Sequence, residues 1–161
     1  MQQKLSDVKV AGRIPQEDLE GLLSGKIPLA QFLGLSRRAL DQIAEIGYNM
    51  LATGRLAQAR QIYEGLVAAQ PFDSLYYCHL GAVYQRLNEL GKAVDAYTRA
   101  LQLDLRNVDA LAGRGEIYLH YGRHREAIDD LSEAIRLDPQ GKHATSVRAR
   151  ALIGTVGKAS D

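Results

Sequence analysis

The sequence predicts an all-α protein built from three tandem helix-turn-helix units stacked as an α-solenoid, with a helical segment before them and a capping helix after them. The chain matches itself at a shift of 34 residues. Within each unit, apolar residues recur at the spacing of an amphipathic helix. Gly and Pro fall where such helices would turn or stop. Since one unit cannot bury its apolar face alone, stacking of the units is expected.

Six positions repeat with similar residues in the three units. Small residues at these positions let two helices approach closely, and the aromatic residues fill the space between them. The aligned triplets are Gly47, Gly81 and Gly115; Met50, Tyr84 and Tyr118; Ala59, Ala93 and Ala127; Tyr63, Tyr97 and Leu131; Leu66, Ala100 and Ala134; Pro71, Leu105 and Pro139.

The expected order begins with a disordered stretch, residues 1–14, and an N-terminal helical segment, residues 15–39. In that segment "PQEDLEGLLSG" has the spacing of a short amphipathic helix that starts at Pro15. An apolar cluster of Leu29, Phe32, Leu33 and Leu35 follows.

The three units are predicted at residues 40–73, 74–107 and 108–141. Gly54, Gly91 and Gly122 lie in or near the turns inside the units, where a left-handed cap suits Gly. Pro71 and Pro139 are expected to stop the second helix of their units.

Residues 142–156 are predicted to form the capping helix, and residues 157–161 a disordered tail. Within the cap, Val147, Ala151 and Leu152 are expected to share the packed face. Its basic residues, Lys142, Arg148 and Arg150, indicate a solvated surface rather than a nucleic-acid patch.

Composition narrows the class of protein. The chain has 161 residues, which suits one domain, and a formal net charge of +1, which gives no overall attraction to nucleic acid or anionic membrane. Its single cysteine, Cys78, excludes a disulfide within the chain. No apolar run approaches the ~20 residues of a membrane span, and the N-terminal sequence has no apolar core of a signal peptide. A cytoplasmic protein without direct membrane insertion is therefore expected.

The repeating residues resemble the tetratricopeptide repeat, a pair of antiparallel helices that stacks into a right-handed solenoid. The third unit, "LAGRGEIYLHYGRHREAIDDLSEAIRLDP", carries the resemblance most clearly. It implies that the second, fifth, ninth and twelfth residues of each unit line a channel that binds an extended peptide. These are Asp41, Ala44, Tyr48 and Leu51; Leu75, Cys78, Ala82 and Gln85; Asp109, Ala112, Glu116 and Leu119. Arg86 and His120 are expected at its edge.

The same resemblance excludes one class of ligand. Repeat domains that hold the acidic C-termini of heat-shock chaperones use a Lys/Asn/Arg clamp. The corresponding positions here are Ala44, Tyr48, Ala82, Asp109 and Gly113, so the clamp is absent. An extended, partly apolar peptide client fits this lining better, with pockets for its side chains.

Residues 22–85 are also similar to the class II chaperones of bacterial type III secretion, which hold translocator proteins. A motif that precedes the first repeat carries this similarity, with Gly25, Leu29, Gly34, Leu35 and Ser36. The first repeat adds Tyr48, Gly54, Ala59, Tyr63 and Leu66. The resemblance implies that the chain holds an extended segment of one aggregation-prone client, with no nucleotide or other cofactor.

Two questions stay open from the sequence. The resemblance implies a homodimer through an apolar N-terminal surface, and packing of that surface within one chain is the alternative. The surface comprises Leu19, Leu22, Leu23, Leu29, Phe32 and Leu33. A general scaffold for assembling a bacterial complex, such as a pilus or flagellum, is the alternative function; an enzyme or a nucleic-acid binder is disfavoured.

The sequence offers no set of residues with the pattern of a catalytic or metal site. Glu116 and His120 are four residues apart, but Gly122 is expected to separate them from His124, and zinc needs three or four ligands. Cys78 and His79 are adjacent, so their side chains point about 100° apart on a helix. We therefore expect neither metal nor catalysis.

Overall fold

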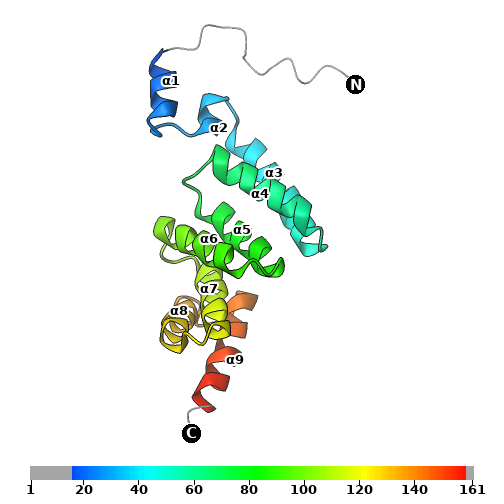
Figure 1. Cartoon of the computed structure of the whole chain (residues 1–161), viewed down its shortest axis with the longest axis vertical. Helices are drawn as coiled ribbons and strands as arrows, with labels where there is room; N and C mark the ends of the chain where they lie inside the picture. Colours follow the sequence, from blue (N-terminus) through cyan, green and yellow to red (C-terminus); the bar gives the residue numbers. More distant parts are fainter. Residues whose placement is uncertain (1–15, 159–161) are drawn as a thin grey trace.

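The computed structural model describes residues 16–158, which form nine α-helices within that range (Figure 1). The prediction of an all-α solenoid is confirmed. The predicted disorder of residues 1–14 and the start at Pro15 lie outside the described residues, as do residues 159–161 of the predicted tail.

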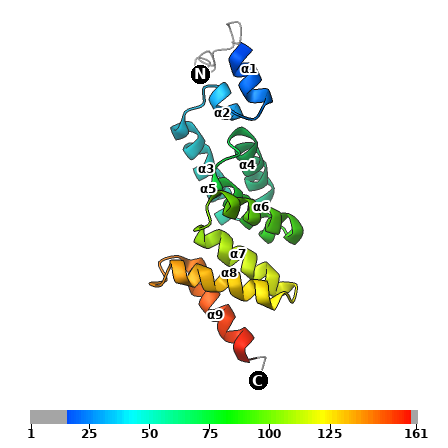
Figure 2. The ribbon, with the colours of Figure 1, turned by 90° about the vertical axis from the view of Figure 1, so that its left-hand side faces the viewer.

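Six helices form three consecutive pairs, which we call repeats 1 to 3, with an A helix followed by a B helix in each. Repeat 1 comprises α3 (Arg37–Ala52) and α4 (Leu56–Ala69), repeat 2 comprises α5 (Ser74–Arg86) and α6 (Leu90–Leu103), and repeat 3 comprises α7 (Val108–His120) and α8 (His124–Leu137). Two short helices precede them, α1 (Gln16–Leu23) and α2 (Leu29–Phe32), and α9 (Ala144–Lys158) follows. Figure 2 shows the pairs following one another along the long axis, with α1 and α9 at opposite ends.

The A helices begin at residues whose side chains accept a hydrogen bond from the first turn. Ser36 Oγ accepts from the Ala39 amide at 3.2 Å, and Asn107 Oδ1 accepts from the Ala110 amide at 2.9 Å. Asp73 Oδ1 accepts from the Leu75 amide at 2.9 Å. Such caps satisfy amides that have no partner inside the helix, and each fixes where an A helix starts.

The turns between A and B helices each need one residue with a left-handed backbone. Gly54 and Gly122 supply it in repeats 1 and 3, with φ of 80° and 70°. In repeat 2, Asn88 takes this conformation with φ of 61°, whereas Gly91 lies inside α6. The expectation for Gly91 is therefore corrected: asparagine tolerates the left-handed region and replaces glycine in this turn.

The repeats pack through a large side chain of the B helix that covers a glycine of the A helix. Tyr63, Tyr97 and Leu131 hold this position and are buried, at 0%, 3% and 0% exposure. A β-carbon on Gly81 would lie 2.7 Å from the Tyr97 ring. These glycines are therefore required for close helix approach, as the 34-residue period indicated.

The helix α9 continues the period as the A helix of a fourth unit that has no B helix in the described chain. Ala149 stands 34 residues after Gly115 and is buried, at 1% exposure. Ser146 is also buried, whereas Val147 is 52% exposed. The predicted packed face of this helix was therefore wrong for Val147 and Ala151. Hydrogen bonds from Ser146 and Arg150 to Asp138 set its rotation instead.

Candidate functional site

The predicted channel residues come from one side of the three A helices, which we call the A-helix face. Direct contacts join neighbouring helices along this face. The ring centroids of Tyr48 on α3 and His79 on α5 lie 5.7 Å apart. Gln85 Nε2 on α5 donates to Glu116 Oε2 on α7 at 3.0 Å. The face is therefore one continuous surface across repeats 1 to 3.

The twelve predicted residues differ in exposure. Asp41, Tyr48 and Leu75 are exposed, and the half-buried members are Ala44, Ala82, Gln85, Asp109, Glu116 and Leu119. Leu51, Cys78 and Ala112 are buried, at 8%, 4% and 3% exposure. Instead of lining the face as predicted, these three pack in the core beneath it.

An aromatic group lies where repeats 1 and 2 meet. Tyr48 is 55% exposed and packs edge-on against His79, which also lies 5.2 Å from the ring of buried Tyr63. Burial lowers the pKa of His79, and burial raises the pKa of Tyr63. Tyr63 Oη donates to the carbonyl of Ala44 at 2.9 Å. This part of the face therefore presents uncharged aromatic surface at neutral pH, suited to apolar side chains.

The part of the face formed by repeat 3 is acidic, but α9 partly neutralises it. Arg148 Nη2 lies 3.3 Å from Glu116 Oε2, and His143 Nδ1 lies 3.8 Å from Asp109 Oδ1. Thr145 Oγ1 donates to Asp109. The sequence prediction did not place His143, Thr145 or Arg148 on the face, although the alignment of Ala149 with Gly115 was a signal that α9 extends it.

Polar contacts also fix the edge of the face near repeat 1. Arg37 pairs with Asp41 at 2.8 Å and with Asp73 at 2.7 Å, which ties the start of α3 to the cap of α5. Arg86, expected at the edge, donates to the carbonyl of Leu51 near the end of α3. A cation here satisfies a helix C-terminus as well as bordering the face.

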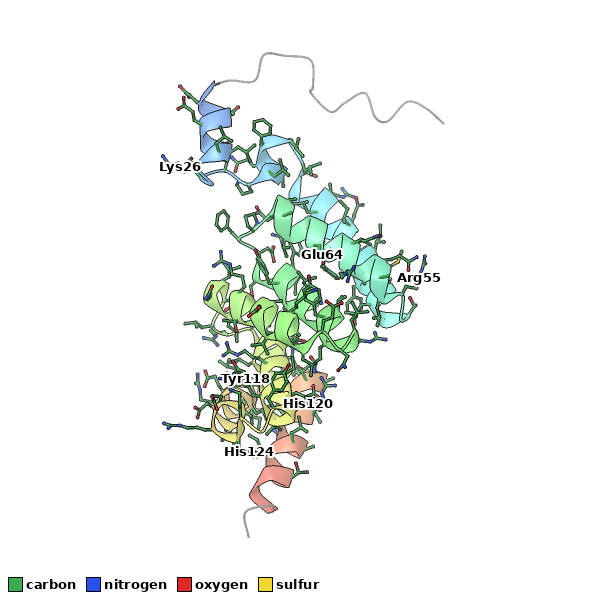
Figure 3. The ribbon with its side chains drawn as sticks, in the orientation of Figure 1. Lys26, Arg55, Glu64, Tyr118, His120 and His124 are labelled. Carbon is green, nitrogen blue, oxygen red and sulfur yellow. The ribbon has the colours of Figure 1, made fainter. Side chains whose placement is uncertain are left out.

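Glu116, His120, His124 and Cys78 do not form a reactive group. Figure 3 shows His120 and His124 on opposite sides of the turn between α7 and α8. Within residues 16–158, no group of three or more His, Cys, Asp or Glu residues has the arrangement of a metal site. Burial raises the pKa of Cys78 to about 12, so this cysteine is a neutral thiol.

The N-terminal segment exposes a second apolar surface. Leu23, Leu29 and Leu33 are 79%, 37% and 43% exposed, and Leu22 and Phe32 are half-buried. The side chain of Leu19 lies outside the described part of the structure. Two apolar residues of α3 that the sequence prediction did not include, Ile43 and Ile46, are also exposed, at 38% and 51%. Among residues 16–158 no B helix precedes repeat 1 to cover them.

Comparison with known proteins finds one family profile that matches part of the chain. Residues 78–142 match the family profile described as tetratricopeptide repeat. The chain spans 20% or less of the length of several eukaryotic relatives that it matches. It is 24% identical to low calcium response locus protein H of Yersinia pestis over 131 residues, which cover 81% of this chain and 76% of that protein.

Two solved structures have a similar fold. The type III secretion translocator chaperone SycD of Yersinia enterocolitica superposes with a TM-score of 0.72 at 21% identity, covering 80% of this chain and 98% of that chain. PcrH in complex with the chaperone-binding region of PopD superposes with a TM-score of 0.71 at 27% identity, covering the same shares. None of the helices in the described range is long and apolar enough to cross a membrane.

Proposed function

We propose that this tetratricopeptide repeat protein, which is similar to type III secretion translocator chaperones, holds an extended segment of a client protein on its A-helix face. The client is a translocator-like protein with apolar stretches that aggregate when unprotected. Binding covers part of the client and delays its self-association until release.

The observation that carries this proposal is the similarity to PcrH over 98% of that chain, because PcrH was solved with a bound segment of its client. The A-helix face supports it with surface of suitable chemistry. Tyr48 and Leu75 are 55% and 47% exposed on adjoining A helices, where they are available to apolar side chains of a peptide. The packed repeats beneath keep this surface preformed, which reduces the entropy cost of binding.

The proposed activity needs no catalysis, nucleotide or metal. Binding and release follow from the affinity of the face for the client and from competition with the client's later partners. A cytoplasmic location fits this role, because the client must be held before it is secreted.

Capture of bound proteins from the native cells tests the proposal. The wild-type chain is compared with Tyr48→Glu and Ala82→Arg, which place charges on the A-helix face. Tyr121→Glu is the matched control, since Tyr121 is 50% exposed at the end of α7. Both face variants should retain the wild-type helicity and melting temperature, because Tyr48 is exposed and Ala82 is half-buried.

We expect one dominant membrane-active protein that both face variants lose and the control keeps, and whose solubility falls without the chaperone. Several soluble partners with no effect on their solubility would support the alternative, a scaffold for a bacterial assembly. A dominant client that both face variants still capture would move the binding surface elsewhere.

We also propose that the apolar N-terminal surface pairs two copies of the chain. Exposure of Leu23 and Leu33 in the single chain supports this. Light scattering with size-exclusion chromatography should give a dimer for the wild-type chain and a monomer for Leu23→Glu. A wild-type monomer would favour packing of this surface within one chain or against the client.

A further inference from the structure

A second surface lies on the other side of α5 from the A-helix face. It is a furrow of about 280 Å³ that we call the α5–α6 furrow. Its lining residues are Tyr77, Leu80 and Tyr84 of α5, with Lys92, Asp95, Ala96 and Arg99 of α6. At 100° per residue, Leu80 and Tyr84 point well away from Leu75 and Ala82 around α5. The furrow is therefore separate from the proposed client site.

Comparison of repeats 2 and 3 explains why the furrow is open. The residues 34 positions after Leu80 and Ala96 are Arg114 and Asp130. Arg114 Nε and Nη2 donate to Asp130 at 2.7 and 2.8 Å, and Arg114 Nη1 donates to Thr98 at 3.1 Å. This pair bridges α7, α8 and α6 and fills the space. The side chains of Leu80 and Ala96 are too short to bridge the helices in this way, so the same position in repeat 2 has an unfilled apolar floor.

Two cations, Lys92 and Arg99, and one carboxylate, Asp95, line the rim of this floor. Lys92 Nζ lies 5.5 Å from the centroid of the Tyr84 ring, and Arg99 Cζ lies 5.9 Å from the centroid of the Tyr77 ring. Figure 3 labels Glu64 on α4, whose carboxylate accepts a hydrogen bond from Tyr84 Oη at 2.8 Å. The two tyrosines are thereby held as walls of an apolar slot.

The charges at the rim are not equally satisfied. Lys92 pairs with Glu89 at 2.6 Å. Arg99 donates to the neutral side chain of Gln102 at 3.1 Å, and it makes no ion pair with any carboxylate of the described residues. An arginine over an aromatic ring, beside an apolar slot, complements a carboxylate attached to an apolar group.

We propose that the α5–α6 furrow docks an extended protein segment in which an aliphatic or aromatic side chain is followed by an acidic residue. The apolar side chain enters between Tyr77 and Tyr84, and the carboxylate pairs with Arg99. At about 280 Å³ the furrow is smaller than the pockets of about 300–1,000 Å³ that hold small-molecule ligands, so its volume favours one large side chain. This site does not depend on the A-helix face, so the chain binds two protein segments at once.

Titration of the ¹⁵N-labelled full chain tests the furrow with a defined probe, the blocked tetrapeptide acetyl-Gly-Phe-Asp-Gly-amide. The matched probe replaces Asp by Asn and so removes only the charge. We expect saturable shifts of amides in α5 and α6, with a Kd in the millimolar range, and about fivefold weaker binding of the Asn probe. Tyr48→Glu should leave the titration unchanged, because it lies on the other surface.

Three variants complete the test. Arg99→Gln should weaken the Asp probe to the level of the Asn probe, and Arg125→Gln, an exposed arginine of α8, should have no effect. The double variant Leu80→Arg/Ala96→Asp copies the closing pair of repeat 3 and should abolish binding. The proposal is overturned if the shifts fall outside α5 and α6, if both probes bind equally, or if Arg99→Gln and Arg125→Gln behave alike. Arg99→Gln decides the matter if the double variant does not fold.

Discussion

The pair formed by Arg114 and Asp130 gives the sharpest test of how repeat 3 is stabilised. Two charge-assisted hydrogen bonds of 2.7 and 2.8 Å join them, and Asp130 is only 7% exposed. Replacing Arg114 with Leu leaves that carboxylate without its partner in a nearly dry site. Breaking a buried pair from one side costs about 3–5 kcal/mol.

We expect the lower end of that range, about 3 kcal/mol, because the Arg114 side chain is still 19% exposed to solvent. A loss of this size lowers the melting temperature by about 6–12 °C in a chain of this length. Asp130→Ala should cost a similar amount, since it leaves the guanidinium unpaired. The double variant Arg114→Leu/Asp130→Ala should cost less than about 1.5 kcal/mol, because repeat 2 already places Leu80 and Ala96 at these positions.

Urea unfolding followed by circular dichroism at 222 nm gives the three free energies of a double-mutant cycle. The coupling should exceed about 2 kcal/mol, since each single change creates the unpaired charge that the double change removes. Single changes that add to the double change within about 0.5 kcal/mol would refute the reasoning, because the two groups would then act independently.

Four further variants test the turns and helix packing. Hydrogen bonds from Ser146 and the His143 amide lower the pKa of Asp138 in the folded chain. Its contribution to stability is therefore present above the unfolded pKa near 4 and is lost as the pH falls below it. Asp138→Asn should flatten the fall in stability between pH 6 and pH 2, and an unchanged pH profile would contradict this. Gly113→Ala should destabilise by about 1–3 kcal/mol, because its β-carbon would lie 2.5 Å from the Tyr97 ring; Gly65→Ala, with open space, should stabilise by about 0.5–1 kcal/mol, and equal melting temperatures would count against the packing argument. Asn88→Gly should raise stability by about 1 kcal/mol by relieving its left-handed backbone, and a lower melting temperature would argue against that strain.

The sequence predicted the repeat because its causes are local and periodic. Gly47, Gly81 and Gly115 recur every 34 residues, since each must admit the covering side chain of its own B helix. Helix ends were equally readable, although α6 ends at Leu103 without the proline that follows α4 and α8. In repeat 2 no proline is needed: the Asp104 amide donates to the Ala100 carbonyl at the end of α6, and the Asn107 side chain caps the start of α7.

The candidate site was predicted less completely, because exposure depends on residues distant in sequence. The family spacing gave Tyr48 and Leu75 correctly as surface residues but also included Cys78, which neighbouring helices bury. The 34-residue spacing indicated that α9 extends the face, but the pairing of Arg148 with Glu116 also depends on the rotation of α9 set by Asp138 and Ser146.

The sequence by itself determined the fold, the number of repeats and the face on which the A helices align, because glycine, alanine and cap residues act on neighbours within one unit. Only the tertiary structure decided which of these side chains remain available and which gaps stay open. Leu80 and Arg114 occupy the same position in the period, yet one leaves a furrow and the other fills it. Whether a gap is filled depends on the reach and charge of side chains from three helices at once, and no single stretch of sequence contains all three.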